Sequence, residues 1–495
     1  MTRLNEGSAR ALPPTVRRFT YDRAAVRTGI VHLGTGAFHR AHQATYYEAT
    51  LESGDLRWGV LGASLRSASV RDQMVPQDGL YSLVVRDGED ERIQLVGAIR
   101  DVLVAPEDPT RLVAAMAASD THLVTLTVTE KGYKLDPATG ALIESDADLA
   151  ADLASLDRPR TAPGLIVAAL AARRAAGLAP FTAISCDNLP HNGTRLRAAA
   201  LALAGRHDPD LAKWIEGEGA FPETMVDRIV PATEAEDIAA LTAKIGVEDR
   251  AMVKTEPFTQ WVVQDWFAGE RPDLAAHGVQ LTTAVAPWEE AKLRLLNGAH
   301  SGLAYLGALA GIEFVHQFVA FDGGRGFVEA LWDQAEATLT PPAELDVAAY
   351  RAQLMARFTN SALRHRTLQI AMDGSQKLPQ RLLHGIGQRL ERGEDVGVMA
   401  LAVAAWMRWQ DGRDDAGMAH VVDDPLAART AAVARLPTAE AVRGLMAIDA
   451  IFPPALAAHD GFTASLARSL EDLRQKGARA VMEERFGTWG SSRRS

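Results

Sequence analysis

The stretch 29-GIVHLGTGAFHRAH-42 decides the fold of the first half of the chain. Its apolar start is typical of a short buried strand, and Gly34 and Gly36 follow where that strand should end. Residues 40–54, directly behind the turn, have helical spacing and end in a glycine. After a polar leader of about 28 residues, the fold is therefore expected to begin with a strand, a tight turn and a helix.

Strands and helices then alternate along the chain. Further strands are predicted at residues 57–65, 79–88, 92–104, 122–129 and 181–188, and helices near 109–118 and at 163–177. This alternation favours an α/β domain with a largely parallel sheet, which we place at residues 1–284. From 285 to 495 helical spacing dominates, so a mostly α-helical second domain is expected, with a frayed polar tail at 490–495.

The composition excludes several classes of protein. The chain has 495 residues, 47% of them hydrophobic, and so has ample material for two cores. Its 52 Lys and Arg against 63 Asp and Glu give a net charge of −11 without a dense basic cluster, which disfavours nucleic-acid binding. The longest apolar stretches, such as 301–312, are shorter than the roughly 18 residues of a membrane span. The single cysteine, Cys186, and a start without an apolar secretion core favour a cytoplasmic protein.

The turn at Gly34 and Gly36 lies where dinucleotide-binding folds hold a pyrophosphate on backbone amides and a helix N-terminus. His39 replaces the usual third glycine, and an ordinary tight turn is the alternative. The second strand should end in an acidic residue that binds the adenosine ribose, but Ser64 and Arg66 stand there. Because Arg66 suits either a 2′-phosphate or stacking on adenine, these residues leave NAD and NADP open.

A polar cluster interrupts the apolar helix predicted across 292-KLRLLNGAH-300. At about 100° per residue, Glu289, Lys292, Asn297 and His300 share one arc of this helix. Desolvation lowers the pKa of a lysine, and a neutral amine near pH 7 acts as a general base. Taken singly, these residues could be a solvated ion pair, a helix kink and a core histidine. Taken together, they favour a catalytic site.

Three further polar positions are candidates. Asn188, at the carboxyl end of a predicted strand, is placed to donate to a developing oxyanion, unless it only forms a turn. Asp227 either orients an amide of the site or pairs with Arg228. Lys377 lies in a turn-rich loop, from which it could reach a substrate hydroxyl or carboxylate or simply face solvent. The sequence has no zinc-type motif and no carboxylate cluster at ligand spacing, so no metal is expected.

Several of these stretches resemble the polyol-specific long-chain dehydrogenases, the mannitol dehydrogenase family. The resemblance covers nearly the whole chain, and the spacing K-x-x-x-x-N-x-x-H is its most specific part. It runs through "GIVHLGTGAFHRAHQA", "PQDGLYSLV", "TVTEKGY", "SCDNLPHNG", "TMVDRIVPAT" and "QIAMDGSQKLPQRLL". The family implies a Rossmann-like dinucleotide-binding domain, a helical substrate-binding and catalytic domain, a nicotinamide cofactor and no metal.

The resemblance also implies roles for individual residues. Lys292 resembles the family's catalytic lysine, and Asn188 and Asn297 resemble its oxyanion-holding asparagines. His300 resembles the histidine that orients the substrate, and Glu289 a carboxylate that helps the proton leave toward solvent. The remaining expected contacts are Lys377 and Asp227 to substrate, and Gly34, Gly36, Phe38 and Arg66 to the cofactor. NAD is the expected cofactor, and NADP stays open.

Within the family, "SLRS", "PQDGLY" and "IAMDGSQKLPQRLL" look most like fructuronate reductase, also called D-mannonate oxidoreductase. The resemblance therefore implies D-mannonate and D-fructuronate as the substrate pair, with D-mannitol and D-fructose, or another polyol, as the alternative. A phosphopolyol dehydrogenase, which needs an additional cationic pocket, and a catalytically silent sugar or nucleotide sensor are the remaining alternatives. The expected partner is a small molecule, and the chain is expected to act as a monomer or a weak homo-oligomer.

Overall fold

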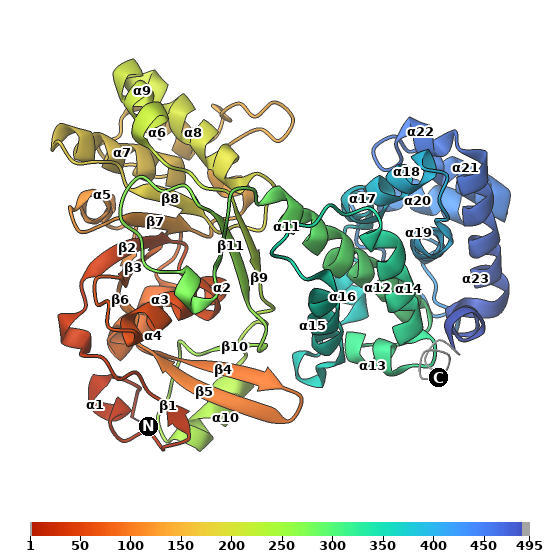
Figure 1. The fold of residues 1–495 in the computed structure, drawn as a ribbon, viewed down its shortest axis with the longest axis horizontal. Helices are drawn as coiled ribbons and strands as arrows, with labels where there is room; N and C mark the ends of the chain where they lie inside the picture. The colour runs from red at the N-terminus through yellow and green to blue at the C-terminus, as the bar shows by residue number, and fades with distance from the viewer. Residues whose placement is uncertain (1, 488–495) are drawn as a thin grey trace. The chain divides into compact units, whose positions relative to one another are not determined.

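The computed structural model describes residues 2–487, and its chain divides into two compact units at residue 286. Of the described residues, 2–286 form an α/β unit, and 287–487 form a helical unit (Figure 1). The polar tail expected at 490–495 lies outside the described residues. Each unit has its own core and is described by itself.

The centre of the α/β unit is a five-stranded sheet in which all strands are parallel. In spatial order its strands are β6 (Ile99–Val104), β3 (Gly59–Ser64), β2 (Thr28–Leu33), β7 (Leu123–Leu126) and β8 (Thr182–Ser185). The chain runs from β2 through β3 to β6 on one side and then crosses to β7 and β8 on the other. The order therefore reverses between β2 and β7, which is where open α/β sheets bind ligands. The predicted α/β fold with a parallel sheet is confirmed.

Both faces of this sheet are covered, which explains why its strands have nearly continuous apolar sequences. Successive residues of a strand face opposite sides: Ile30 and Leu123 pack into a core with α3, whereas Val31 and Val124 pack into a core with α5, α7 and α8. Figure 1 shows α5 and α7 on the same side of the strands. The helices around the sheet are α2 (Ala37–Ala41), α3 (Gln43–Glu52), α5 (Pro109–Ala117), α6 (Ala147–Ala154), α7 (Ala162–Ala175), α8 (Asn192–His207) and α9 (Pro209–Glu218).

Two smaller sheets complete the α/β unit. A four-stranded mixed sheet has the order β1 (Val16–Arg17), β5 (Asp90–Val96), β4 (Tyr81–Asp87) and β10 (Val253–Thr255), and a three-stranded sheet has the order β12 (Gln280–Thr282), β11 (Gln260–Gln264) and β9 (Thr224–Asp227). The first 28 residues are part of this fold rather than a separate leader: β1 pairs with β5, and the amide of Leu4 donates to the carbonyl of Glu248 at 2.9 Å. The remaining short elements are α1 (Glu6–Ala9), η1 (Arg23–Ala25), α4 (Ser69–Met74), η2 (Val75–Gln77), η3 (Glu130–Tyr133), α10 (Ala235–Ile245) and η4 (Ala275–His277).

Glu48 is a buried carboxyl group in the core beside α3. Its Oε2 accepts hydrogen bonds from the amides of Gly97 at 2.9 Å and Ala98 at 2.7 Å and from the hydroxyl of Tyr21 at 3.1 Å. Burial outweighs these bonds and raises the pKa of Glu48 from 4.5 to about 7. Between these two pH values the folded chain holds a proton that the unfolded chain has lost.

Glu48 is therefore expected to make the protein less stable as the pH rises from about 4.5 to about 7. The loss is about 3 kcal/mol at most, from about 1.4 kcal/mol per unit of pKa. In urea denaturation, Glu48→Gln should become more stable relative to wild type between pH 5 and pH 8. Glu52→Gln, on the same helix, is the control for removing a carboxylate. A Glu48→Gln difference that does not change with pH would refute the protonation of Glu48.

The helical unit is built around two apolar helices, α12 (Gly298–Leu309) and α19 (Gly397–Trp409), which pack on each other. The long element α23 (Asp460–Phe486), whose helix is interrupted at Gly477 with φ 80° and ψ 159°, packs against α19, as Figure 1 shows in blue. Of the described helices, none combines the length and apolar character needed to traverse a lipid bilayer. The other elements are α11 (Ala286–Ala291), η5 (Lys292–Asn297), α13 (Val315–Ala320), α14 (Gly324–Glu336), α15 (Val347–Thr359), η6 (Ser361–Leu363), α16 (Thr367–Ile370), α17 (Gly374–Leu378), η7 (Pro379–Leu383), α18 (His384–Glu391), α20 (Ala427–Ala434), α21 (Thr438–Met446) and α22 (Pro454–Ala457).

Candidate active site

The glycine turn at the end of β2 exposes backbone without side chains at the point where the strand order of the sheet reverses. Gly34 has φ +93°, and a Cβ there would lie 2.1 Å from the carbonyl oxygen of Thr127, which follows β7. Only glycine meets both conditions. Gly36 is the N-cap of α2, and the nearest atom to a Cβ at this position would be 3.8 Å away. The open space over Gly36 and the amides that begin α2 fit a pyrophosphate.

His39, at the position of the usual third glycine, fills the space between α2 and β2. Its ring is fully buried and stacks on the ring of His32, with 3.4 Å between centroids and 14° between planes. His32 is fixed by the hydroxyls of Thr125 at 2.7 Å and Thr127 at 3.0 Å. Burial lowers the pKa of His32 to about 3 and that of His39 well below its usual value. Both rings are thus neutral at pH 7, which allows the two to stack closely.

Phe38 and Arg66, the other two residues expected at the cofactor, lie beside the turn and beyond β3. Phe38 is half-buried and stacks on the ring of His42, with 5.0 Å between centroids. Arg66 is exposed two residues after Ser64, the last residue of β3. The strand end that carries a ribose-binding acid in typical NAD-binding folds therefore has a cation in this protein.

Asn188 lies exposed at the carboxyl edge of the same sheet, just after β8. The residue before it, Asp187, fixes this edge: its carboxylate accepts from the amides of Val128 at 2.9 Å and Thr129 at 2.8 Å and from the hydroxyl of Tyr133 at 2.8 Å. Asp187 thus ties the loop after β7 to the end of β8. Asn188 is held at the edge where the glycine turn lies, as expected for a residue that reaches a ligand.

Asp227 is the buried last residue of β9, a strand held against the end of β8 by Asn192. The Nδ2 of Asn192 donates to the carbonyl of Thr224 at 2.9 Å, and the amide of Thr224 donates back to Oδ1 at 3.0 Å. Arg228, the alternative partner of Asp227, donates to the carbonyl of Glu256 at 3.0 Å and to a carbonyl of α2. The Arg228 guanidinium is thus used to fix backbone.

In the helical unit, Glu289, Lys292, Asn297 and His300 lie on one continuous helix made of α11, η5 and α12. The segment η5, from Lys292 to Asn297, is a π-helix, in which each amide bonds five residues back. The arc expected from 100° per residue therefore does not extend unchanged through this segment. Lys292 and His300 are buried, with 7% and 8% of their surface exposed, while Glu289 and Asn297 are half-buried. Short π-helical turns are frequent at functional sites.

A second π-helical segment, η7, brings Lys377 to this helix. A Cβ at Gly298 would lie 3.0 Å from the carbonyl oxygen of Arg381, so glycine allows the backbone of η7 to approach α12 closely. The Nη1 of Arg381 donates to the hydroxyl of Ser301 at 3.2 Å. Lys377, on the helix that leads into η7, donates to the carbonyl of Met372 at 2.6 Å. Burial is the main cause that lowers the pKa of Lys377, and the charge of Arg381 lowers it further.

His300 is surrounded by other basic groups. Its ring lies 4.9 Å from that of Phe358 and 5.2 Å, edge-on, from that of His365. Burial lowers the pKa of His300 well below its usual value, and His365, Arg357 and Arg381 lower it further. Burial and Arg357 likewise lower the pKa of His365 to about 4. The imidazole of His300 is thus neutral at pH 7 and is available as a hydrogen-bond donor or acceptor.

Sequence reasoning did not single out Arg357, His365 or Arg381. Only Arg381 carries a usable signal: it lies four residues after Lys377, a spacing that places two side chains on one face of a helix. Arg357 and His365 are far from the motif in sequence and reach His300 only through the packing of α15 and the loop behind it.

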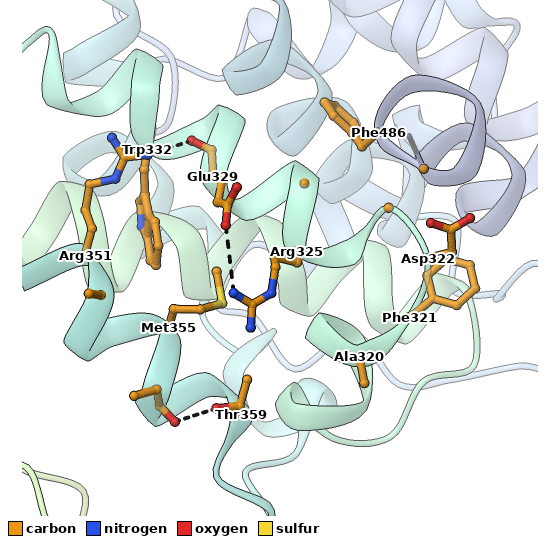
Figure 2. Close-up of a pocket in the computed structure, with 15 residues that line it drawn as sticks. Ala320, Phe321, Asp322, Arg325, Glu329, Trp332, Arg351, Met355, Thr359 and Phe486 are labelled. Carbon is orange, nitrogen blue, oxygen red and sulfur yellow. Dashed lines mark hydrogen bonds and ion pairs between the residues drawn. The ribbon is translucent and has the colours of Figure 1, made fainter. Parts of the chain in front are cut away.

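A hollow of about 980 Å³ in the helical unit is lined by none of the predicted site residues. Figure 2 shows Arg325 directed toward Glu329, at 3.9 Å, and the Arg351 side chain beside Trp332. Arg351 also pairs with Asp333 at 2.8 Å. Both arginines that line this hollow are thus paired with carboxylates of the same unit. Within residues 2–487 no group of three or more His, Cys, Asp or Glu is placed to hold a metal ion.

A parallel sheet with an open glycine turn at its switch point, followed by a helical unit with a buried lysine and histidine on one helix, is the architecture of a dinucleotide-dependent oxidoreductase. The family profile of the mannitol dehydrogenase Rossmann domain matches residues 28–276, and that of the mannitol dehydrogenase C-terminal domain matches residues 284–474. The chain therefore belongs to the mannitol dehydrogenase family. The predicted family and the predicted class of enzyme are confirmed.

Similar proteins are named for two kinds of substrate. D-mannonate oxidoreductase of Escherichia coli (strain K12) is 41% identical over 94% of this chain and 97% of its own length. Mannitol 2-dehydrogenase of Pyrenophora tritici-repentis is 40% identical over 94% of this chain and 83% of its own length. A solved structure, Pseudomonas fluorescens mannitol 2-dehydrogenase in a ternary complex with NAD and D-mannitol, is 36% identical, with a TM-score of 0.82 and coverage of 98% of this chain and 99% of that chain. These similarities leave the choice between sugar acid and polyol open.

Proposed function

We propose that this protein is an NAD-dependent, metal-independent oxidoreductase that interconverts D-mannonate and D-fructuronate. The observation that favours a sugar acid over a neutral polyol is the guanidinium of Arg381, whose Nη1 donates to the carbonyl of Asn297 at 3.4 Å and to the hydroxyl of Ser301 at 3.2 Å. A carboxylate is stabilised by such a cation, whereas an uncharged hydroxymethyl group gains little from it. In this proposal residues 1–284 bind the dinucleotide, and residues 285–495 supply the general base and most of the substrate contacts.

Lys292, in its amine form, accepts the proton of the alcohol as the carbon loses hydride. The bound dinucleotide supplies the hydride acceptor when mannonate is oxidised and the hydride donor in the reverse direction. The side-chain amides of Asn188 and Asn297 donate to the substrate oxygen as it gains negative charge. His300 hydrogen-bonds a neighbouring hydroxyl, which fixes the carbon chain. Lys377 and Asp227 are proposed to hold further hydroxyls of the substrate.

Glu289 is proposed to carry the proton from Lys292 toward solvent. It lies three residues before Lys292, in the last turn of α11, and its side chain is half-buried. Residues three apart are neighbours on a helix surface, so this carboxylate is within reach of the lysine. Lys292 can then return to its amine form after each turnover.

NAD is the proposed cofactor. The bare turn at Gly34 and Gly36 fits the pyrophosphate of either dinucleotide, and the similar Pseudomonas structure is a complex with NAD. The exposed Arg66 beyond β3 is the residue that would favour NADP, through a 2′-phosphate. A direct comparison of the two cofactors decides between them.

The expected result with purified protein is rapid loss of NADH absorbance at 340 nm on addition of D-fructuronate, with slower oxidation of NADPH. The rate should not change in the presence of EDTA, because the proposed mechanism uses no metal. Preference for D-fructose would keep the mechanism and move the substrate to D-mannitol, the substrate class of the mannitol 2-dehydrogenases. Turnover of neither ketose would contradict the proposed reaction.

A further inference from the structure

Arg381 is a half-buried cation for which the described residues provide no carboxylate. It lies in η7, and its Nη1 donates to the carbonyl of Asn297 at 3.4 Å and to the hydroxyl of Ser301 at 3.2 Å. No Asp or Glu within residues 2–487 forms an ion pair with it. A guanidinium that is removed from water without a counter-ion is destabilising. An anion that arrives from outside would offset this cost.

The guanidinium still has donors to offer. Nη1 is held by Asn297 and Ser301, whereas Nε and Nη2 make no hydrogen bond to any residue of the described chain. These two nitrogens form one edge of the planar group, and that edge matches the two oxygens of a carboxylate in a bidentate pair. The two bonds from Nη1 orient the plane, so that the free edge is fixed in direction before the ligand binds.

The free edge belongs to the predicted site. Asn297, whose carbonyl binds Arg381, is one of the two proposed oxyanion donors. Besides burial, the charge of Arg381 is among the causes that lower the pKa of His300 and of Lys377. The three side chains, from α12, α17 and η7, are therefore close enough to interact. Lys292 lies five residues before Asn297 on the same continuous helix.

We infer that Arg381 binds the carboxylate of the substrate through Nε and Nη2 and so makes the enzyme specific for a sugar acid. This inference rests on the function proposed above. D-fructuronate and D-fructose share the ketone at C2 and differ at C6, which is a carboxylate in the first and a hydroxymethyl group in the second. When the neutral sugar binds, the guanidinium edge has no anion to pair with. This loss of an ion pair should strongly favour fructuronate over fructose.

The test is the ratio of kcat/KM for D-fructuronate to kcat/KM for D-fructose, measured with NADH for wild type, Arg381→Gln and Arg381→Lys. For Arg381→Gln we expect kcat/KM for fructuronate to fall on the order of 100-fold, mainly through KM, while that for fructose changes less than about threefold. Arg381→Lys keeps the positive charge but loses the two parallel N–H donors of the guanidinium. Its kcat/KM for fructuronate should fall about tenfold, and its kcat/KM for fructose should not change. Because the lysine keeps a positive charge beside Asn297, Arg381→Lys also tests the inference if Arg381→Gln fails to fold.

Ser301→Ala is the control for a purely structural role. It removes the hydroxyl that orients Arg381 and leaves the guanidinium, so the ratio should move less than in either Arg381 variant. Equal losses for the two ketoses, or an unchanged ratio, would overturn the inference. A wild-type enzyme that does not reduce fructuronate would instead overturn the proposed function, which separates the two failures. Urea denaturation, compared with wild type, shows whether each variant has kept its fold.

Discussion

Replacement of Lys292 by alanine is expected to lower kcat for fructuronate reduction by a factor of about 10²–10⁴, the usual contribution of a general acid or base. The reason is that no other amine on the α11–η5–α12 helix can exchange a proton with the substrate oxygen. KM and the affinity for NADH should change little, because the lysine acts on the reacting oxygen. Steady-state kinetics at several pH values, with NADH binding measured separately, check this.

Lys476→Ala is the matched control. Lys476 lies on the long helix α23 of the same unit and pairs with Glu484 at 2.8 Å, and exposed ion pairs of this kind contribute little to stability. This variant should keep wild-type turnover. A Lys292→Ala enzyme that does the same would eliminate the lysine as the general base and would leave His300 to be tested in its place.

Substitution of Gly34 by alanine is expected to destabilise the α/β unit by about 2–5 kcal/mol and to abolish dinucleotide binding. Two costs add: the left-handed backbone at φ +93° costs about 1–2 kcal/mol for an L-residue, and the backbone must shift to relieve a Cβ placed 2.1 Å from the carbonyl of Thr127. The shift displaces the turn that fits the pyrophosphate. Urea denaturation gives the stability, and fluorescence titration with NADH gives the affinity.

Gly54→Ala separates the two costs. Gly54 has φ +99°, and no atom lies within 4 Å of a Cβ at this position, so its substitution adds backbone strain without a collision. Gly54→Ala should cost about 1–2 kcal/mol and leave NADH binding intact. If the two variants lose the same stability and both keep NADH binding, the close approach between Gly34 and Thr127 has no role in the cofactor site.

The parallel sheet could be predicted because its strands are buried on both faces. In β7 and β8 every residue is buried, and such strands appear in the sequence as short apolar runs bounded by turn residues. The smaller sheets were less visible. The two-residue strand β1 lies within the segment expected to be a polar leader, and its pairing with β5 depends on residues far away in the sequence.

The helix predicted at residues 40–54 is broken in the structure at His42, with φ −122° and ψ −89°. Neither glycine nor proline marks the break. His42 Nε2 instead hydrogen-bonds the carbonyl of Gln260 at 2.8 Å, and its ring packs edge-on against Trp261. A contact over more than 200 residues thus sets the end of α2, and local propensity gives no sign of it.

The site was predictable in its residues but not in its geometry. The spacing of Lys292, Asn297 and His300 was sufficient to select the helix, whereas its π-helical turn did not follow from that spacing. Arg381 was part of a quoted motif, but a guanidinium becomes informative only when its partners are known. The catalytic and binding roles of the individual residues remain predictions, to be tested by the substitutions above.

The thiol of Cys186 is enclosed in the core between β8 and α3, and burial raises its pKa well above the ordinary value. Maleimides react with accessible thiolates, so the native protein should resist labelling until it unfolds. Cysteines introduced on exposed positions would then be the first groups to react, without prior removal of a native one. Dye pairs placed on the two units would report, in single molecules and in real time, any movement between them during turnover.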